Sequence, residues 1–217
     1  MAYDSTLGRL PDPTTTPAGP GFISVDLAPV DPGMVHSLNS GATVSVRYPG
    51  GSYWNISITY PDLDIEQARS LQPFLYSLQG VYSDFYVSIP QHTQPQTGAW
   101  VGYNPQQDSI AMGDASNIIE IIDWSSMSGT NDITAGDMLK LSSSKKIYFV
   151  TKVEQVGTKL IVSLNCDVIN PNLINFSFLQ MNDILFKVRS TAAIPALKLN
   201  SSGLYSSFSL SLRENIL

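Results

Sequence analysis

The residues of this chain that could carry out chemistry are few, and their spacing matches no catalytic motif. The sequence contains one cysteine, Cys166, and two histidines, His36 and His92, which lie far apart. A histidine beside a cysteine can activate it as a nucleophile, and the sequence leaves a pairing of Cys166 with His92 open without supporting it. Cys166 lies in the apolar stretch LIVSLNCDV, where a cysteine usually behaves as a small buried hydrophobic residue.

Motifs for hydrolysis and phosphate binding are missing. Ser142 and Lys145 have Ser-x-x-Lys spacing, but they fall in a run of serines that predicts a solvated turn between two strands. The chain contains neither GxGxxG nor GxxxxGK followed by Ser or Thr, which are the glycine-rich loops that bind phosphates. It also lacks the GxSxG sequence of the nucleophile elbow in α/β-hydrolases.

The carboxylates have structural explanations. Asp62, Asp64 and Glu66 precede and open a predicted helix, where negative charge caps the helix and compensates its dipole, so we favour this role over acid–base catalysis. Neither Asp167 nor Asp183 has DxDxDG-type spacing around it, and a single cysteine excludes a metal site made of cysteines. The sequence therefore predicts no enzyme activity, no cofactor and no metal.

Alternating apolar and polar residues predict strands over 22–27, 42–48 and 53–60. The tight turn Pro49-Gly50-Gly51 separates the last two, which we therefore expect to form a hairpin. Near the C-terminus, Phe208, Leu210 and Leu212 alternate with serines. That pattern predicts a half-buried strand with a serine-lined outer face.

A helix is predicted over residues 64–79. Asp64 and Gln67 have capping-box spacing, and Gly80 is a natural stop. Pro73 lies inside the segment, where a proline removes a backbone hydrogen bond, so we expect a kink or two short helices. One apolar stripe recurs at helical spacing: Ile65, Ala68, Leu71, Leu75 and Leu78.

The remaining pattern indicates a second β unit. Residues 91–113 are rich in Gln, Pro and Gly and predict a connection. Four short strands follow at intervals of about ten residues, which is typical of a small barrel or sandwich. Two last strands need a partner sheet. We therefore predict an all-β chain with one kinked helix, in which a discontinuous β-sandwich domain (22–113 and 183–217) carries an inserted β-domain (114–182).

Residues 1–21 predict an extended N-terminal arm. Seven of these residues are Pro or Gly, which disfavour a helix or a central strand. Few side chains in the arm are apolar, so we expect either a frayed terminus or an arm that becomes ordered only on a neighbouring subunit. The candidate interface residues are Pro11, Pro13, Pro17, Pro20, Trp100 and Tyr103.

Composition supports a structural protein. Charged residues are only 14%, and Ser, Thr, Asn and Gln together account for 63 of 217 residues, which is common in β-rich proteins that assemble. The net charge of -6 argues against binding of a nucleic-acid backbone. We find no apolar run long enough to insert into a membrane and no ordinary signal peptide.

Three segments resemble the distal tail proteins of tailed bacteriophages. The first is YPGGSYWNISITYPDLDIEQARSLQPFLYSLQGVYSDFYVSIP, and the second is GDMLKLSSSKKIYFVTKVEQVGTKLIVSL, which is similar to the inserted β-domain of that family. The third, YSSFSLSLREN, resembles its last strand. The matching residues are Tyr60, Pro61, Leu63, Glu66, Phe74, Leu75, Leu78, Gly80, Tyr82, Gly136, Asp137, Tyr148, Val150, Gly157 and Glu214.

The resemblance implies a function without chemistry. Members of this family form rings, commonly with six-fold symmetry, that join the tail tube to the baseplate or tail tip. It thus implies copies of the chain, tail-tube proteins and baseplate hub or tip proteins as partners, in a virion assembled in the host cytoplasm. The alternative is a carbohydrate-binding or capsid-decorating virion module, because Trp54, Trp100 and Trp124 could stack on sugar rings. Trp54 is in phase with Ile56 and Ile58 and is expected in the core, whereas Trp100 lies in the connecting segment and fits an interface as well as a core.

Overall fold

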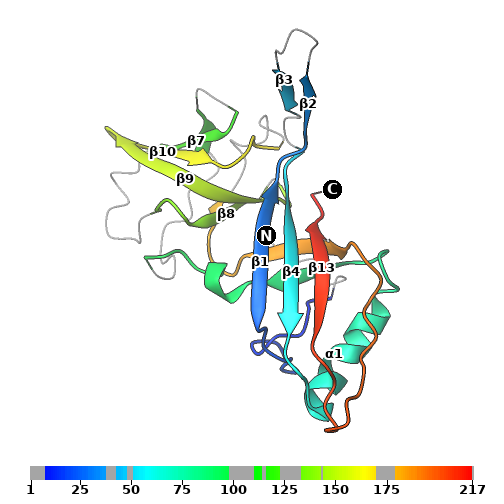
Figure 1. The fold of residues 1–217 in the computed structure, drawn as a ribbon. Coiled ribbons are helices and arrows are strands. Elements are labelled where there is room, and N and C mark those ends of the chain that lie inside the picture. The colour runs from blue at the N-terminus through cyan, green and yellow to red at the C-terminus, as the bar shows by residue number, and fades with distance from the viewer. Residues whose placement is uncertain are drawn as a thin grey trace. The chain divides into compact units, whose positions relative to one another are not determined.

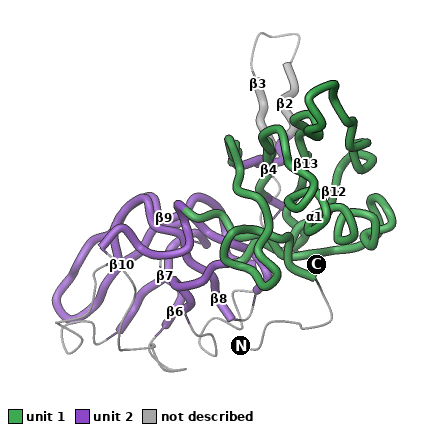
Figure 2. Tube along the Cα trace, turned by 90° about the horizontal axis from the view of Figure 1, so that it is seen from below, with its two compact units in different colours: residues 1–28, 54–90, 185–217 green, residues 29–53, 91–184 purple. Residues whose placement is uncertain are grey.

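The computed structural model describes residues 8–37, 43–47, 51–97, 110–113, 116–122, 133–142, 144–169 and 179–216. The chain forms two compact units, which are coloured separately in Figure 2. Unit 1 comprises residues 1–28, 54–90 and 185–217, and unit 2 comprises residues 29–53 and 91–184. Unit 1 is therefore assembled from three separate segments of the chain.

Unit 1 is built on a five-stranded sheet with the strand order β1-β4-β13-β12-β5. Figure 1 shows β1, β4 and β13 side by side in this order. The pairs β4–β13, β13–β12 and β12–β5 are antiparallel. The strands are β1 (Ser24–Val30), β4 (Tyr53–Tyr60), β5 (Asp84–Ser88), β12 (Leu185–Ser190) and β13 (Phe208–Glu214). The prediction of an all-β fold is confirmed, with α1 as the α-helix of the described residues.

Strict alternation gives the centre of this sheet one buried face. Every second residue of β4 and β13 is buried, and the register places Leu210 opposite Ile58. Trp54 is 4% exposed, which confirms its predicted place in the core. At the end of β4, the ring of Tyr60 stacks on that of Phe208 with centroids 4.9 Å apart. Burial of these large side chains is the main stabilising contribution to unit 1.

Helix α1 (Ile65–Ser77) begins where its sequence signals predict. The Asp64 carboxylate accepts a hydrogen bond from the Gln67 amide at 2.8 Å, and Gln67 Oε1 accepts one from the Asp64 amide at 3.2 Å. This is the predicted capping box. The helix ends before Gln79 and Gly80, both of which have positive φ. Pro73 lies within one continuous helix rather than between two short ones.

Helix α1 packs through most of its predicted apolar stripe. Ala68, Leu71 and Leu75 are buried, and the ring of Phe74 meets that of Phe85 on β5 edge to face, with centroids 5.6 Å apart. Ile65 also belongs to the predicted stripe but is 52% exposed, because it lies in the first turn. The helix therefore covers the sheet from its second turn onward.

The N-terminal segment folds onto unit 1 itself. The Tyr86 amide donates to Gly8 O at 2.9 Å, and the Leu10 amide donates to Tyr86 O at 2.8 Å, so residues 8–10 pair in parallel with β5. Leu10 is only 1% exposed. The expectation that the arm, residues 1–21, becomes ordered only on a neighbouring subunit is therefore wrong for residues 8–21, and residues 1–7 lie outside the described residues. The segment is held by burial of the Leu10 side chain and by backbone hydrogen bonds to the outer edge of β5. The number of apolar residues in the arm does not reveal either contact.

Asp12 closes the rest of this segment into a turn-rich loop. Its carboxylate accepts hydrogen bonds from the Arg9 guanidinium at 2.8 Å and from the Thr14 amide at 2.7 Å, and its carbonyl accepts one from the Gly19 amide at 2.8 Å. Burial would raise the pKa of Asp12, but the hydrogen bonds from Thr14 and Arg9 outweigh it and hold the pKa below its usual value. The segment is a folded loop, not the extended arm that its prolines suggest.

This loop leads to a prediction about two glycines. A Cβ atom on Gly19 would lie 2.3 Å from the backbone carbon of Pro11, whereas one on Gly21 would meet only Pro13 Cγ, at 3.8 Å. We expect Gly19→Ala to lower the free energy of unfolding by about 1–3 kcal/mol through overpacking, and Gly21→Ala to be nearly neutral. Urea titration of both variants tests this. Equal effects would show that the loop does not have this close approach.

Unit 2 contains a six-stranded sheet with the order β11-β8-β9-β10-β7-β6. The strands are β6 (Ile110–Met112), β7 (Ile118–Ile121), β8 (Met138–Leu141), β9 (Ile147–Val156), β10 (Lys159–Leu164) and β11 (Leu179–Gln180). The two short outer strands, β6 and β11, were not predicted. Cys166 lies in the core of this unit beside Leu164 and Val168, as predicted for a small buried hydrophobic residue.

The predicted hairpin across Pro49-Gly50-Gly51 is wrong. β3 (Thr43–Arg47) pairs with β2 (Gly33–Ser37) in a separate two-stranded sheet. β4 lies between β1 and β13 (Figure 1). Both edges of β4 are therefore already occupied, so it has no backbone groups left to pair with β3.

Candidate assembly surface

The outer face of β4 and β13 is lined with hydroxyl groups. The register places Ser57 opposite Ser211 and Thr59 opposite Ser209, and the hydroxyls of Thr59 and Ser209 are hydrogen-bonded at 3.0 Å. We call these four residues the hydroxyl face. Ser209 and Ser211 are exposed, whereas Ser57 and Thr59 are partly buried. The serine-lined outer face predicted for the last strand is thus present, and β4 extends it.

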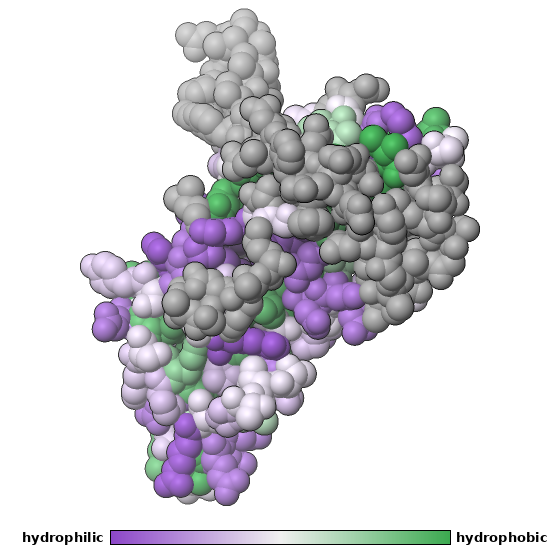
Figure 3. Space-filling view, turned by 180° about the vertical axis from the view of Figure 1, so that it is seen from behind, coloured by the Kyte–Doolittle hydropathy of each residue, from purple (hydrophilic) through white to green (hydrophobic). Residues whose placement is uncertain are grey.

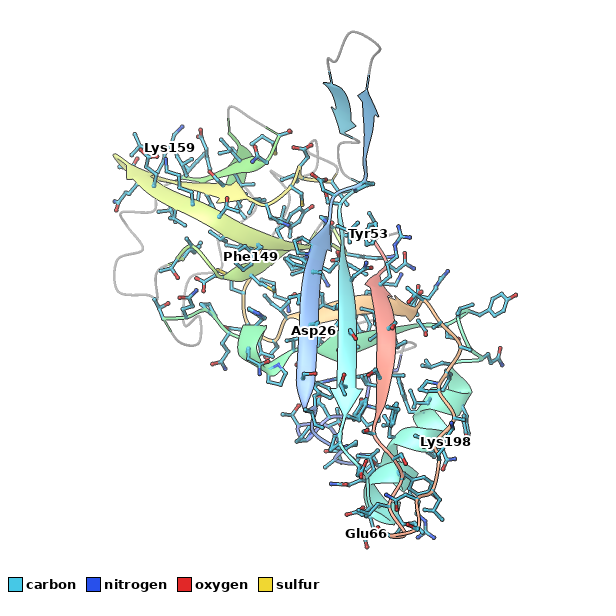
Figure 4. All side chains as sticks on the ribbon, in the orientation of Figure 1. Asp26, Tyr53, Glu66, Phe149, Lys159 and Lys198 are labelled. Atoms are coloured by element: carbon cyan, nitrogen blue, oxygen red, sulfur yellow. The ribbon has the colours of Figure 1, made fainter. Side chains whose placement is uncertain are left out.

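Charged groups on this side of the sheet lie at the border of the hydroxyl face. Arg213 ends the row on β13, opposite Asn55 on β4 and Arg189 on β12. Asp26, which Figure 4 labels, is exposed on the neighbouring strand β1. The centre of the hydroxyl face carries no ionisable group. A partner can therefore cover it without having to bury an unpaired charge, which would be costly.

An ion cluster around Asp84 borders this region. Asp84 Oδ1 accepts from Arg189 Nε at 2.8 Å, and Oδ2 lies 3.0 Å from Lys187 Nζ and accepts from Asn215 Nδ2 at 2.8 Å. Burial would raise the pKa of Asp84, but hydrogen bonds from Asn215, Arg189 and Lys187 outweigh it and lower the pKa. The cluster ties β5, β12 and the residues after β13 together.

Sequence reasoning missed this cluster because its members are far apart in the chain. Asp84 lies more than 100 residues before its partners. The signal that could have revealed it is the pair Lys187 and Arg189 in the otherwise apolar stretch ILFKVRS. Charged residues are rarely buried in a strand without a partner of opposite charge, so these two predict a carboxylate nearby without saying which one.

The predicted interface residues lie in different environments. Pro11 and Pro20 are buried in unit 1, and Pro13 and Pro17 are exposed at the tip of the N-terminal loop. Trp100 and Tyr103 fall outside the described residues, as does Trp124. Only Pro13 and Pro17 among the described candidates can therefore reach another molecule without rearrangement.

The candidates for chemistry that the structure describes lie in different elements of the fold. Ser142 and Lys145 lie in the turn between β8 and β9, where the Ser144 amide donates to Leu141 O. Asp62 accepts a hydrogen bond from the Ser207 amide at 2.7 Å. His92 lies in a short 3-10 helix, where burial lowers its pKa. The side chain of His36 lies outside what the structure describes.

Asp167 and Asp183 are held by local hydrogen bonds, through the side chain at Asp167 and through the backbone at Asp183. Asp167 accepts from the Ser116 hydroxyl at 2.6 Å, and the Asp183 amide donates to Thr93 O at 2.8 Å. Within the described ranges, no group of three or more His, Cys, Asp or Glu residues is placed to hold a metal ion. No α-helix in that part of the chain is long and apolar enough to cross a membrane.

A buried lysine in unit 2 is a second feature that sequence reasoning missed. Lys146 is 1% exposed. Its ammonium group donates to the carbonyl of Ser52 and lies 5.8 Å from the centroid of the Tyr148 ring. Ser52 Oγ in turn donates to Asp31 Oδ1 at 2.6 Å. Lys146 thus links Ser52, which lies between β3 and β4, to the turn between β8 and β9.

Exposed apolar residues do not form one broad patch on the side shown in Figure 3. Among its described residues, small hydrophobic areas are separated by hydrophilic ones. The most exposed large apolar residues in unit 1 are Ile23, Ile65, Tyr76, Val81, Tyr82, Leu199 and Leu204. Scattered residues of this kind are normal on a protein surface. The hydroxyl face is therefore the more distinctive surface of unit 1.

The fold defines an all-β protein in which a sheet unit assembled from separate chain segments is combined with a second β unit. Two family models match it: "Distal tail protein pb9, A domain, N-terminal" over residues 10–92, and "Distal tail protein pb9, B domain" over residues 100–175. The chain is 32% identical over 213 residues to distal tail protein pb9 of Escherichia phage T5, covering 96% of this chain and 100% of that relative. The chain belongs to the distal tail protein pb9 family of bacteriophage tail proteins, which confirms the resemblance found in the sequence.

Proposed function

We propose that this protein is a non-enzymatic component of a phage tail that forms a ring between the tail tube and the baseplate or tail tip. The observation that carries this proposal is the 32% identity to a distal tail protein along that relative's whole length. Its partners are then other copies of the chain, commonly six in a ring, with tail-tube proteins and baseplate hub or tip proteins. The protein acts in the virion after assembly in the host cytoplasm, without a cofactor.

The surface of unit 1 supports a role in assembly. The cores of protein interfaces are depleted in charged residues, and the hydroxyl face has none at its centre. Ser209 and Ser211 project from a regular sheet, so little conformational entropy is lost when a neighbour covers them. We propose the hydroxyl face as one contact between ring neighbours. We propose the exposed loop tip at Pro13 and Pro17 as a second contact, and Trp100 and Tyr103 as further interface residues.

The two parts of the chain have separate tasks in this proposal. The ring domain is built on the five-stranded sheet, within residues 22–113 and 183–217, and it includes the hydroxyl face. β6 (Ile110–Met112) pairs with β7 and so belongs to the other sheet. Residues 114–182 form an inserted domain that is available for contacts with other tail proteins. Sheet continuity supports this division, since the C-terminal strand β13 pairs with β4 and β12 and thus brings the end of the chain back to its beginning.

Electron microscopy tests the proposal directly. In negative stain, the purified full-length chain should form rings, and gold-labelled antibody against it should bind virions at the far end of the tail. Ser211→Glu places a charge on the hydroxyl face and should reduce the fraction of chains in rings at least about tenfold, since an unpaired charge buried in an interface costs several kcal/mol. The control Ser201→Glu, in an exposed turn, should form rings normally. Rings of Ser211→Glu as abundant as those of the wild type would contradict the proposed contact, and label elsewhere on the virion would contradict the function.

A further inference from the structure

The N-terminal segment covers one edge of the five-stranded sheet. β1 and β5 are its outermost strands. At β5, the backbone amide and carbonyl of Tyr86 point away from β12 and are both bonded to the N-terminal segment, through Gly8 O and the Leu10 amide. An unoccupied strand edge offers a row of such groups to any other chain. Residues 8–10 therefore occupy the place that an added strand would take.

The fit of this segment is specific in both backbone and side chains. A Cβ atom on Gly8 would lie 2.7 Å from Phe74 Cε2 on α1, so the position accepts a residue without a side chain. Two residues on, the Leu10 side chain is buried. The Asp12 carboxylate then turns the chain through its bonds to Arg9 and Thr14. Backbone bonds that supply affinity and a pocket that selects a side chain are the features of strand-addition sites.

We infer that the β5 edge is a strand-addition site whose occupant is this chain's own segment Gly8–Asp12. By filling the site, the segment caps the sheet and keeps β5 from pairing with a strand of a second copy. The site recognises a short extended peptide of the form Gly-x-Leu, bound in parallel, with a backbone donor at the leucine. This function is independent of ring formation, because it concerns an edge within a single chain.

Displacing the segment from the full-length chain is the first test. Leu10→Asp puts a charge into the leucine pocket and should release the segment. Amide hydrogen exchange of Tyr86 should then accelerate at least about tenfold, while the amides of Phe85 and Val87 stay protected because β5 pairs with β12 on its other side. Light scattering should show species heavier than the wild type at equal concentration. The control Ala18→Asp, at an exposed position of the same loop, should leave the exchange rate of the Tyr86 amide as in the wild type.

A peptide supplied in trans tests recognition itself. A fluorescent peptide of residues 8–21 should bind the Leu10→Asp chain in an anisotropy titration, restore protection of the Tyr86 amide and return the mass to that of the wild type. The same peptide with an N-methyl group on Leu10 lacks the donor and should bind at least about tenfold more weakly. An N-methyl group on Arg9, whose amide takes no part in the pairing described for this edge, should have little effect.

Several outcomes would overturn the inference. They are unchanged protection of the Tyr86 amide in Leu10→Asp, an unchanged mass, or equal binding of the two N-methylated peptides. If Leu10→Asp unfolds unit 1, so that the amides of Phe85 and Val87 also exchange, the same measurements on Gly8→Ala decide, because its Cβ atom displaces the segment more mildly. The amide-exchange and peptide-binding results do not depend on whether the chain forms rings, so the inference and the proposed function can fail separately.

Discussion

Leu71→Ala and Leu75→Ala are each expected to lower the free energy of unfolding by about 2–5 kcal/mol. Both side chains lie on the buried face of α1, with relative exposures of 0% and 1%. Each substitution removes apolar area from the core and leaves a cavity that the rigid sheet cannot fully close. Urea titration followed by circular dichroism measures both variants against the wild type.

Gln72→Ala is the matched control for these two variants. Gln72 lies between them in the sequence, and its amide donates to the Tyr76 hydroxyl in an exposed hydrogen bond of 3.0 Å. Losing that bond should change the free energy of unfolding by no more than about 0.5 kcal/mol. If all three variants show equally small effects, α1 does not pack on the sheet through its leucines.

Asp84→Asn should destabilise the protein at pH 7 by about 3 kcal/mol, the lower end of the range for removing one member of a buried ion pair. The Asp84 side chain is 13% exposed, and its carboxylate accepts hydrogen bonds from Lys187, Arg189 and Asn215. The asparagine side chain has the same shape but no charge, so Lys187 and Arg189 lose their carboxylate. Its NH2 group also faces groups that are themselves donors. The control Glu154→Gln removes a carboxylate from an exposed pair with Lys152 and should change stability little.

The same carboxylate predicts how stability depends on pH. The pKa of Asp84 is lower in the folded chain than in the unfolded chain, so the unfolded chain binds a proton first as the pH falls. The stabilisation is therefore fully present above the ordinary carboxyl pKa of about 4 and is lost as the pH falls below it toward the folded value. Asp12 acts in the same direction. Thermal unfolding between pH 7 and pH 2 should show a steeper loss for the wild type than for Asp84→Asn, and parallel curves would contradict this role.

Local signals predicted the local structure of this chain well. Asp64, Gln67 and Gly80 lie within a few residues of the backbone groups that they cap or terminate, so the limits of α1 could be predicted from the sequence. The exception is Pro73, because a proline beyond the first turn costs a hydrogen bond that tertiary packing can outweigh. The serine-lined face of β13 was predictable for the same reason, since alternation along a strand separates its two faces.

Pairing between distant residues could not be predicted in the same way. Whether β3 pairs with β4 or with β2 depends on which edges of β4 are still free, and β13, more than 140 residues later, takes one of them. The β5 edge accepts residues 8–10 for the same reason. The proline-rich sequence of residues 8–21 does not reveal that β5 has an edge to pair with or that Leu10 will be buried. Both features are created by other parts of the chain.

The sequence by itself determined that the chain is all-β, where its α-helix lies, which residues of the central strands face the core, and to which family the chain belongs. These properties follow from periodicity, caps and motifs, in which the interacting groups are neighbours along the chain. Three features were decided by the tertiary structure alone. The N-terminal segment pairs with the β5 edge, and Asp84 binds Lys187, Arg189 and Asn215. The third is that β4 supplies the second row of the hydroxyl face. Each of these depends on the strand order, because a backbone edge or a buried charge is satisfied by whichever group folding brings beside it.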